Sequence, residues 1–180
     1  MNNLLANFIG FDGRLNRQPF WISGIILAVV SAVISLLILP MLGLSMMPNL
    51  SNIGANTSTA DMAAMLTDLS RKAGWISLVM FLIFVYPSAA ICIKRRHDRN
   101  NNGLDVWIYF GLAAINLLLQ ALGLGMTTTT IGDVTIPTPG PIAMVFGLII
   151  GIYGIYLLVV LGFLKGTTGP NSFGPDPLQG

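Results

Sequence analysis

Apolar residues dominate four long runs that contain no charged residue and are separated by more polar stretches. The runs cover residues 21–44, 74–93, 106–126 and 141–164. A helix needs about 20 consecutive apolar residues to cross the hydrocarbon core of a bilayer, and each run has about that length. The pattern predicts an all-α membrane protein, in which residues 1–180 form one four-transmembrane-helix bundle with a polar tail at 165–180. We expect the first run to be an uncleaved anchor, because it is longer than the apolar core of a secretory signal.

The stretch before the second run has a helical pattern of its own. Its apolar residues Met62, Met65, Leu66 and Leu69 repeat at i, i+3, i+4 and i+7. Ser58 and Asp61 have the spacing of a capping box, which is typical of a helix start. These features predict a short amphipathic helix at the outer surface, separate from the second span.

The stretch between the third and fourth runs has a strand pattern. Residues 127–138 read "TTTTIGDVTIPT", with β-branched residues on both sides of Gly132 and Asp133. A Gly-Asp pair between two β-branched segments is typical of a two-residue hairpin turn. We therefore expect an outer β-hairpin here.

The positions of Lys and Arg predict the orientation of the chain. If both termini are cytoplasmic, the inner segments hold Arg14, Arg17, Lys94, Arg95, Arg96, Arg99 and Lys165, and the outer segments hold only Arg71 and Lys72. Cytoplasmic segments near span ends are enriched in Lys and Arg. The distribution predicts that the N- and C-termini both lie inside.

Composition excludes several classes of function. Charged residues make up 9% of the chain and apolar residues 54%, with a net charge of +2, so there is no basic stripe for nucleic acid. One cysteine, Cys92, and one histidine, His97, cannot supply the ligands of a zinc site within one chain. We expect no metal and no cofactor.

Two features inside the spans have alternative explanations. Asn116 and Gln120 share one face of the third span, where they suit either a polar substrate path or interhelical hydrogen bonds. The second is favoured, because no ionisable residue accompanies them. Gly147, Gly151 and Gly154 form a small-residue ridge that suits a homo-oligomer contact or packing within the bundle.

Three polar segments share the predicted cytoplasmic side: residues 11–21, 94–103 and 166–177. Their candidate ligand-binding or structural residues are Arg14, Arg17, Arg95, Arg96, His97, Asp98, Arg99, Asn171 and Asp176. Basic residues at the inner leaflet suit anionic lipid headgroups or phosphate ligands, although a positive-inside anchor is the simpler explanation. We expect Asp12, Asp98 and Asp176 to pair with these arginines and to tie the three segments together.

The same three segments strongly resemble a bacterial inner-membrane family known as domain of unknown function 805. The shared motifs are "GRxxRxxFW" (Gly13, Arg14, Arg17, Phe20, Trp21), "(K/R)RxHD" (Lys94, Arg95, His97, Asp98) and "GxNxFGPDP" (Gly169, Asn171, Phe173, Gly174, Pro175, Asp176, Pro177). The chain departs from the family at Arg96, where Leu is frequent. The resemblance implies an inner-membrane protein of about four spans, with no assigned reaction and no catalytic residue.

Three functions stay open on the sequence. The first is a non-enzymatic envelope or regulatory scaffold that binds membrane lipids through its basic cluster. The second is a transporter or channel for a small solute or lipid, which would need a polar path reaching Asn116 and Gln120. The third is a membrane enzyme that uses His97 and Asp98, although no Ser or Cys nucleophile motif accompanies this pair. The first is favoured.

Overall fold

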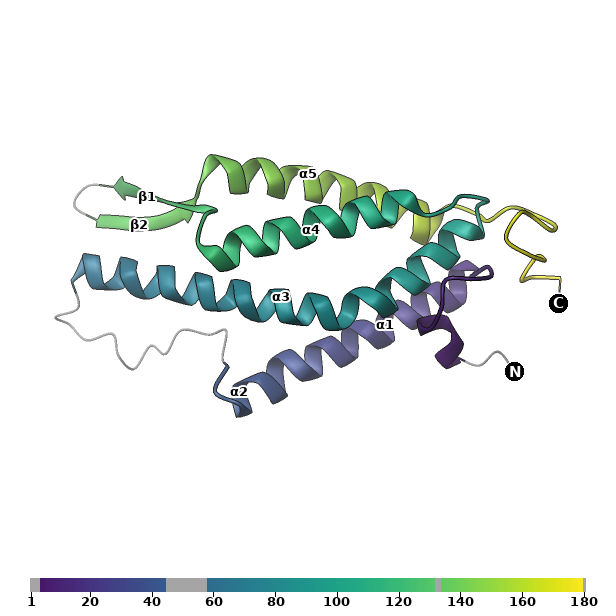
Figure 1. The fold of residues 1–180 in the computed structure, drawn as a ribbon, viewed down its shortest axis with the longest axis horizontal. Helices are drawn as coiled ribbons and strands as arrows, with labels where there is room; N and C mark the ends of the chain where they lie inside the picture. The colour runs from purple at the N-terminus through teal and green to yellow at the C-terminus, as the bar shows by residue number, and fades with distance from the viewer. Residues whose placement is uncertain (1–3, 45–57, 132–133, 180) are drawn as a thin grey trace. The chain divides into compact units, whose positions relative to one another are not determined.

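A computed structural model describes residues 4–44, 58–131 and 134–179 of the chain. Its elements are a 3₁₀ helix η1 (Leu4–Phe8), α1 (Arg17–Val33), a π-helical segment η2 (Ile34–Ile38), α2 (Leu39–Met41), α3 (Thr59–His97), α4 (Leu104–Leu122), β1 (Met126–Ile131), β2 (Val134–Pro139), α5 (Pro141–Leu158) and a π-helical segment η4 (Val159–Phe163). Four helices are long and apolar enough to cross a membrane: Arg17–Met41, Ala60–His97, Leu104–Leu122 and Pro141–Phe163. The four predicted spans are therefore confirmed as helices (Figure 1).

Two spans end earlier than the apolar pattern predicts. The first ends at Met41 instead of residue 44, and the third ends at Leu122 instead of residue 126. In both cases a glycine with positive φ follows, Gly43 at 73° and Gly123 at 75°. Each begins a hydrogen-bonded Schellman turn, a backbone shape that glycine adopts without steric cost. Apolar residues that follow such a turn extend the hydrophobic run but not the helix.

The predicted separate amphipathic helix is wrong, because its residues belong to α3. The start is as expected, since the Ser58 hydroxyl accepts a hydrogen bond from the Asp61 backbone N–H at 3.1 Å. No proline follows until Pro87, and Asp68 and Lys72 form an i,i+4 ion pair of 2.7 Å along the helix. The 39 residues of α3 would extend about 58 Å, nearly twice the hydrocarbon thickness of a bilayer. The preceding stretch, 45–57, lies outside the described residues.

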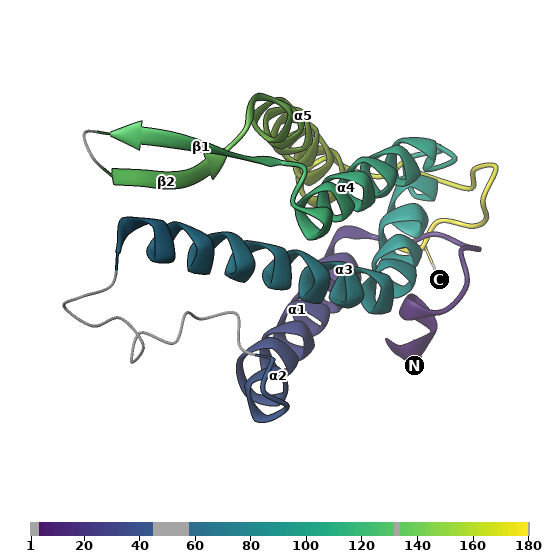
Figure 2. The same ribbon diagram turned by 60° about the vertical axis from the view of Figure 1, so that its left-hand side comes forward.

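The predicted β-hairpin is confirmed. β1 and β2 pair antiparallel, from Met126 opposite Pro139 to Ile131 opposite Val134. This register leaves two residues for the connection, Gly132 and Asp133, which lie outside the described residues. Figure 2 shows the hairpin as a ribbon that leads from the end of α4 to the start of α5.

The chain separates into two compact units. The first contains residues 1–33, 82–111 and 151–180, and the second contains residues 34–81 and 112–150. A buried apolar core in the first unit joins three helices through Ala89, Ile93, Val106, Leu157 and Leu161. All of the residues of the cytoplasmic motifs that the sequence singles out belong to this unit. One domain and one four-helix bundle stay predictions.

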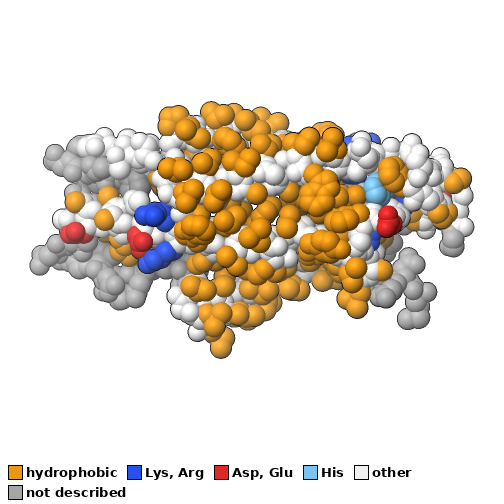
Figure 3. Space-filling view, viewed as in Figure 1, with side chains coloured by type: hydrophobic (Ala, Val, Ile, Leu, Met, Phe, Trp, Pro, Cys, Tyr) orange, Lys and Arg blue, Asp and Glu red, His pale blue; other side chains and the backbone are white. Residues whose placement is uncertain are grey.

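The surfaces of the helices are largely apolar, as spans surrounded by lipid require. Exposed side chains include Ile25 and Val29 of α1 and Ile152 and Ile155 of α5, and Figure 3 shows hydrophobic atoms spread over the helices. On α5, a Cβ added at Gly147 or Gly151 would meet nothing within 4 Å, whereas one at Gly154 would lie 3.4 Å from the Tyr109 hydroxyl. Only the last glycine of the predicted ridge packs within the first unit.

Within the second unit, α3 and α4 approach closely at Gly74. A Cβ at this position would lie 2.6 Å from the backbone nitrogen of Ala121, so neither helix has room for it. We expect Gly74→Ala to force the two helices apart and to lower the stability by about 1–3 kcal/mol. Thermal unfolding in detergent measures this effect.

Gly111→Ala is the matched control, because a Cβ there meets nothing within 4 Å. Its melting temperature should equal or exceed that of the wild type, since alanine favours a helix over glycine. Equal melting temperatures for the two variants would contradict the close approach.

Candidate functional site

The three polar segments predicted to converge lie together at one end of the first unit. We call Arg14, Arg95 and Asp98 the arginine–aspartate cluster. Arg14 precedes α1, whereas Arg95 lies in the last turn of α3 and Asp98 follows it. Their side chains are 1%, 0% and 4% exposed, respectively, so all three charges are buried. Buried charges are costly unless they are paired and hydrogen-bonded.

Asp98 is the central acceptor of the cluster. Its Oδ1 accepts two hydrogen bonds from Arg14, from Nε at 3.2 Å and from Nη2 at 3.1 Å. Its Oδ2 accepts a hydrogen bond from Nη1 of Arg95. One carboxylate therefore lies between two guanidinium groups that come from different segments of the chain.

The guanidinium of Arg14 uses its remaining donors on the C-terminal tail. Nη2 donates to the carbonyl of Thr167 at 2.6 Å, and Nη1 donates to the carbonyls of Gly169 at 2.7 Å and Gly174 at 3.3 Å. Its planar fork can make five such bonds, and five acceptor contacts are present. Arg14 thus joins the N-terminal segment, the inner loop and the tail, and its bonding capacity is fully used.

Side chains from the other two segments cap the C-terminal end of the last span. Carbonyl oxygens at the end of a helix have no partner within the helix, so outside donors must satisfy them. Five consecutive carbonyls, those of residues 160–164, accept hydrogen bonds from Arg99, Arg95, Trp21, Arg17 and again Arg95. Cations at this position also suit the negative end of the helix dipole. Arg95 and Arg99 thus have a structural role here, whereas Arg17 is exposed and uses one donor in this way.

Arg96 belongs to a separate ion pair with Asp105. The two side chains form a fork, with Nε to Oδ1 at 3.1 Å and Nη2 to Oδ2 at 2.8 Å. The hydroxyl of Tyr153 donates to the Asp105 carbonyl at 2.9 Å. The sequence does not indicate this pair, because the turn that reverses the chain between the two residues is not visible in a linear pattern.

Lys94 has a structural role that the sequence did not reveal. Its ammonium donates to the carbonyls of Ala6, in η1, and of Ile9, the latter at 2.8 Å. The backbone N–H of Leu15 donates to the Lys94 carbonyl at 3.1 Å. Through these contacts the buried lysine holds the N-terminal segment against the end of α3.

His97 connects the N-terminal segment and the tail. Its Nδ1–H donates to the Gly13 carbonyl at 3.1 Å, and its ring stacks on Phe173 with centroids 3.9 Å apart and planes 7° apart. Its own carbonyl accepts a hydrogen bond from the Asn171 amide at 2.9 Å. The histidine therefore supplies one polar contact to the N-terminal segment and one flat apolar contact to the tail.

Asp176 shapes the tail instead of pairing with an arginine. Its Oδ2 accepts the backbone N–H of Gly169 at 2.8 Å, and its Oδ1 accepts that of Leu178 at 3.0 Å. The bonds from Leu178 and then Gly169 lower the pKa of this carboxyl, and Arg14 adds a smaller effect. Its predicted ion pairing is wrong, because none of the ion pairs of the described residues includes Asp176. Asp12 is exposed and makes no ion pair within the described residues.

A close approach at Gly166 completes the cluster. A Cβ there would overlap the Asp98 carboxylate, so only glycine lets the chain after the last span pass over it. Thr167 then donates its backbone N–H to the Asp98 carbonyl at 2.8 Å. A sequence pattern does not indicate this requirement, because glycine is frequent throughout the chain.

The remaining candidate residues lie elsewhere. Asn116 and Gln120 are half-buried on α4 and belong to the second unit, so they are not part of the cluster. Their hydrogen-bonding role stays a prediction. Among residues 4–44, 58–131 and 134–179, no group of three His, Cys or Asp side chains could hold a metal ion.

Comparisons with known proteins agree with the membrane architecture. A family model described as "Protein of unknown function (DUF805)" matches residues 8–175, a range that contains the arginine–aspartate cluster. The inner membrane protein YhaI of Escherichia coli K12 and that of Escherichia coli O157:H7 are each 25% identical over 108 residues, covering 60% of this chain and 68% of the relative. No solved structure matches the chain.

Removal of the Asp98 charge should be strongly destabilising. Asp98→Asn leaves two guanidinium groups buried without a counter-charge, which should cost about 3–5 kcal/mol. The matched control is Asp68→Asn, which breaks the exposed pair with Lys72 and should cost less than about 1 kcal/mol. Thermal unfolding of both variants in detergent measures the difference. Similar melting temperatures for the two variants would show that the buried cluster does not hold the fold.

Asp176 should make the fold sensitive to acid. Because folding lowers the pKa of its carboxyl below the ordinary value of 3.8, its contribution is complete above that value and is lost as the pH falls through the lowered pKa. We expect Asp176→Asn to melt below the wild type at neutral pH, and the gap to narrow below about pH 4. Melting curves across this range test the effect, with the exposed Asp12→Asn as control. A gap independent of pH would contradict it.

Proposed function

Because this chain belongs to the DUF805 family of proteins of unknown function, we propose its role from the geometry of the cluster. It is an integral, multi-pass protein of the bacterial inner membrane, as its four apolar helices and its similarity to YhaI support. In our proposal both termini are cytoplasmic, and the protein is a non-enzymatic envelope or regulatory scaffold. Its cytoplasmic face binds the anionic headgroup of a lipid or a phosphate group.

The main support for a structural cluster is that every hydrogen-bond donor of the Arg14 guanidinium is already used. Its five N–H groups donate to four acceptor atoms of Asp98 and the tail, which leaves no donor for a substrate. Asp98 likewise directs each oxygen at an arginine. A catalytic carboxylate needs access to a reacting atom, whereas these groups are buried and paired. The geometry supports a lock that holds three segments of the chain together.

The contacts of His97 point the same way. The Nδ1 atom is engaged by the Gly13 carbonyl, and the ring face is covered by Phe173. Asp98 is adjacent in sequence, but its carboxylate bonds to Arg14 and Arg95 and does not orient the imidazole. The pair therefore lacks the geometry in which a carboxylate prepares a histidine for acid or base work.

Two exposed basic residues, Arg17 and Lys165, are available for an anionic partner, and we call them the rim of the cluster. The exposed side chains of Arg17 and Lys165 take part in none of the ion pairs of the described residues, unlike Arg14, Arg95 and Arg96. Cations near the inner leaflet attract anionic headgroups. We therefore assign anion binding to the rim of the cluster and not to its buried interior.

Cysteine labelling tests the proposed orientation. In a Cys92→Ser background, single cysteines at Thr128 in β1 and at Gln179 in the tail provide two exposed positions. A membrane-impermeant maleimide should label Thr128→Cys in cells with a permeabilised outer membrane, and should label Gln179→Cys only after the inner membrane is disrupted. The positive-inside distribution of Lys and Arg is the reason for this expectation. The reverse labelling pattern would overturn the orientation.

A further inference from the structure

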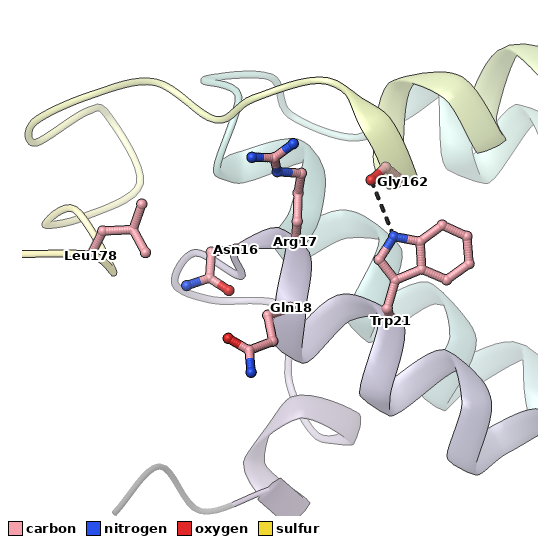
Figure 4. Close-up of a pocket in the computed structure, with 6 residues that line it drawn as sticks. All are labelled: Asn16, Arg17, Gln18, Trp21, Gly162 and Leu178. Atoms are coloured by element: carbon pink, nitrogen blue, oxygen red, sulfur yellow. Dashed lines mark hydrogen bonds between the residues drawn. The ribbon is translucent and has the colours of Figure 1, made fainter.

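Two neighbouring cavities surround the start of α1. One has a volume of about 430 Å³ and is lined by Asn16, Arg17, Gln18, Trp21, Gly162 and Leu178. The other has a volume of about 340 Å³, shares Asn16, Arg17 and Leu178 with the first, and adds Lys165. Figure 4 shows Asn16, Arg17 and Gln18 between the indole of Trp21 and Leu178 of the tail. Three residues line both cavities, so the cavities are neighbours, and we call the pair of cavities around Arg17 the recess.

The recess has an unmatched positive charge. The guanidinium of Arg17 donates to the Phe163 carbonyl at 3.3 Å, and it has further donors for another partner. The larger cavity has no acid in its lining. Asp98 and Asp176 line the smaller one, but Arg14 and Arg95 already neutralise Asp98, and two backbone N–H groups engage Asp176. Phosphate is an acceptor group that suits such a set of donors.

Asn16, which lines both cavities, has an unmatched acceptor. The Oδ1 atom of Asn16 is buried and has no hydrogen-bond partner within the described residues. A buried polar atom without a partner is costly, and such an atom in a native protein calls for an explanation. Phosphate cannot satisfy it, because phosphate oxygens accept. When the Asn16 side chain turns toward the recess, a hydroxyl group that accompanies the phosphate can donate to it.

The apolar side of the recess continues onto the surface of the first span. Trp21 donates its indole N–H to the Gly162 carbonyl at 3.2 Å. Its ring contacts that of Phe163 edge-on, with the ring centroids 5.9 Å apart. Phe163 is 60% exposed, and Ile25 of α1 is 59% exposed. Tryptophan is typical of the boundary between headgroups and acyl chains. A lipid with its phosphate at Arg17 can place its chains along this apolar surface.

We propose that this recess binds a phosphate ester that carries a hydroxyl group, the chemistry of a glycerol-type anionic phospholipid headgroup. Arg17 and Lys165 contact the phosphate, Asn16 accepts from the hydroxyl, and Trp21 and Phe163 line the path of the acyl chains. The assignment rests on the proposed function, since it names the ligand class and the residues of the anion-binding rim.

Lipid binding to the purified, detergent-solubilised chain tests the phosphate contacts. Native mass spectrometry compares phosphatidylglycerol with phosphatidylcholine of the same acyl chains. The double variant Arg17→Gln/Lys165→Gln should lower the affinity for phosphatidylglycerol about 10- to 30-fold. Arg71→Gln/Lys72→Gln changes the net charge equally at two exposed cations of the second unit and should leave the affinity unchanged. Equal losses in both double variants, or no preference for phosphatidylglycerol, would overturn the proposal.

A second comparison tests the hydroxyl contact separately. Phosphatidylmethanol has the same charge as phosphatidylglycerol but has no headgroup hydroxyl, so the wild type should bind it several-fold more weakly. Asn16→Ala should remove this difference while retaining the preference for anionic lipid. Equal binding of the two lipids by the wild type would show that Asn16 Oδ1 is not a ligand contact and would overturn this part of the assignment.

Soluble glycerol phosphate separates the two sources of the ligand chemistry. Weak binding compared with phosphatidylglycerol assigns the site to a lipid, whereas equal binding that Arg17→Gln/Lys165→Gln abolishes assigns it to a soluble phosphate ester; both outcomes support the shared chemistry. The binding assays do not depend on orientation in the cell. If the cysteine labelling is reversed but the protein still prefers phosphatidylglycerol, only the proposed orientation is refuted. If the labelling is as expected but the protein shows no such preference, only this inference is refuted.

Discussion

The structure of the first unit depends on the neutralisation of two buried guanidinium groups by one carboxylate. Transfer of an ion from water to a protein interior costs several kcal/mol, and attraction offsets this only with good geometry and further hydrogen bonds. Asp98 supplies the charge for Arg14 and Arg95, and backbone carbonyls occupy their other donors. Loss of the carboxylate would leave both cations without compensation, so the three segments that meet here are stable only together.

Side chains in and near the same cluster also satisfy the unpaired backbone carbonyls at the end of the last span. Carbonyls that leave a helix at the membrane boundary need donors, and here arginine and tryptophan side chains of the other two segments supply them. The tail then turns back over Asp98 because Gly166 leaves room for it. A count of Lys and Arg near the span ends treats all of these cations as equivalent. The structure divides them into buried structural donors, such as Arg95, and exposed rim charges, such as Arg17.

Much of the architecture was predictable because it depends on local patterns. Apolar runs indicated four spans, and the Gly-Asp pair indicated a hairpin. The errors concern where an element ends and which groups pair. The apolar pattern does not distinguish a helix from the turn that follows it at Gly43, and amphipathic periodicity does not show whether a helix continues, as α3 does. The pairing of Arg96 with Asp105, and the use of Asp176 by backbone donors, depend on chain reversals.

The sequence by itself determined that the chain enters a membrane, that it has four helices long and apolar enough to cross one, and which polar segments gather at one end of the first unit. These properties follow from the length of apolar runs and the placement of charge, since transfer into a bilayer depends mainly on composition along the chain. Only the tertiary structure decided that Asp98 serves two arginines while Arg17 remains exposed at a recess. Burial and hydrogen-bond geometry depend on distances between residues far apart in sequence, and no linear pattern contains those distances.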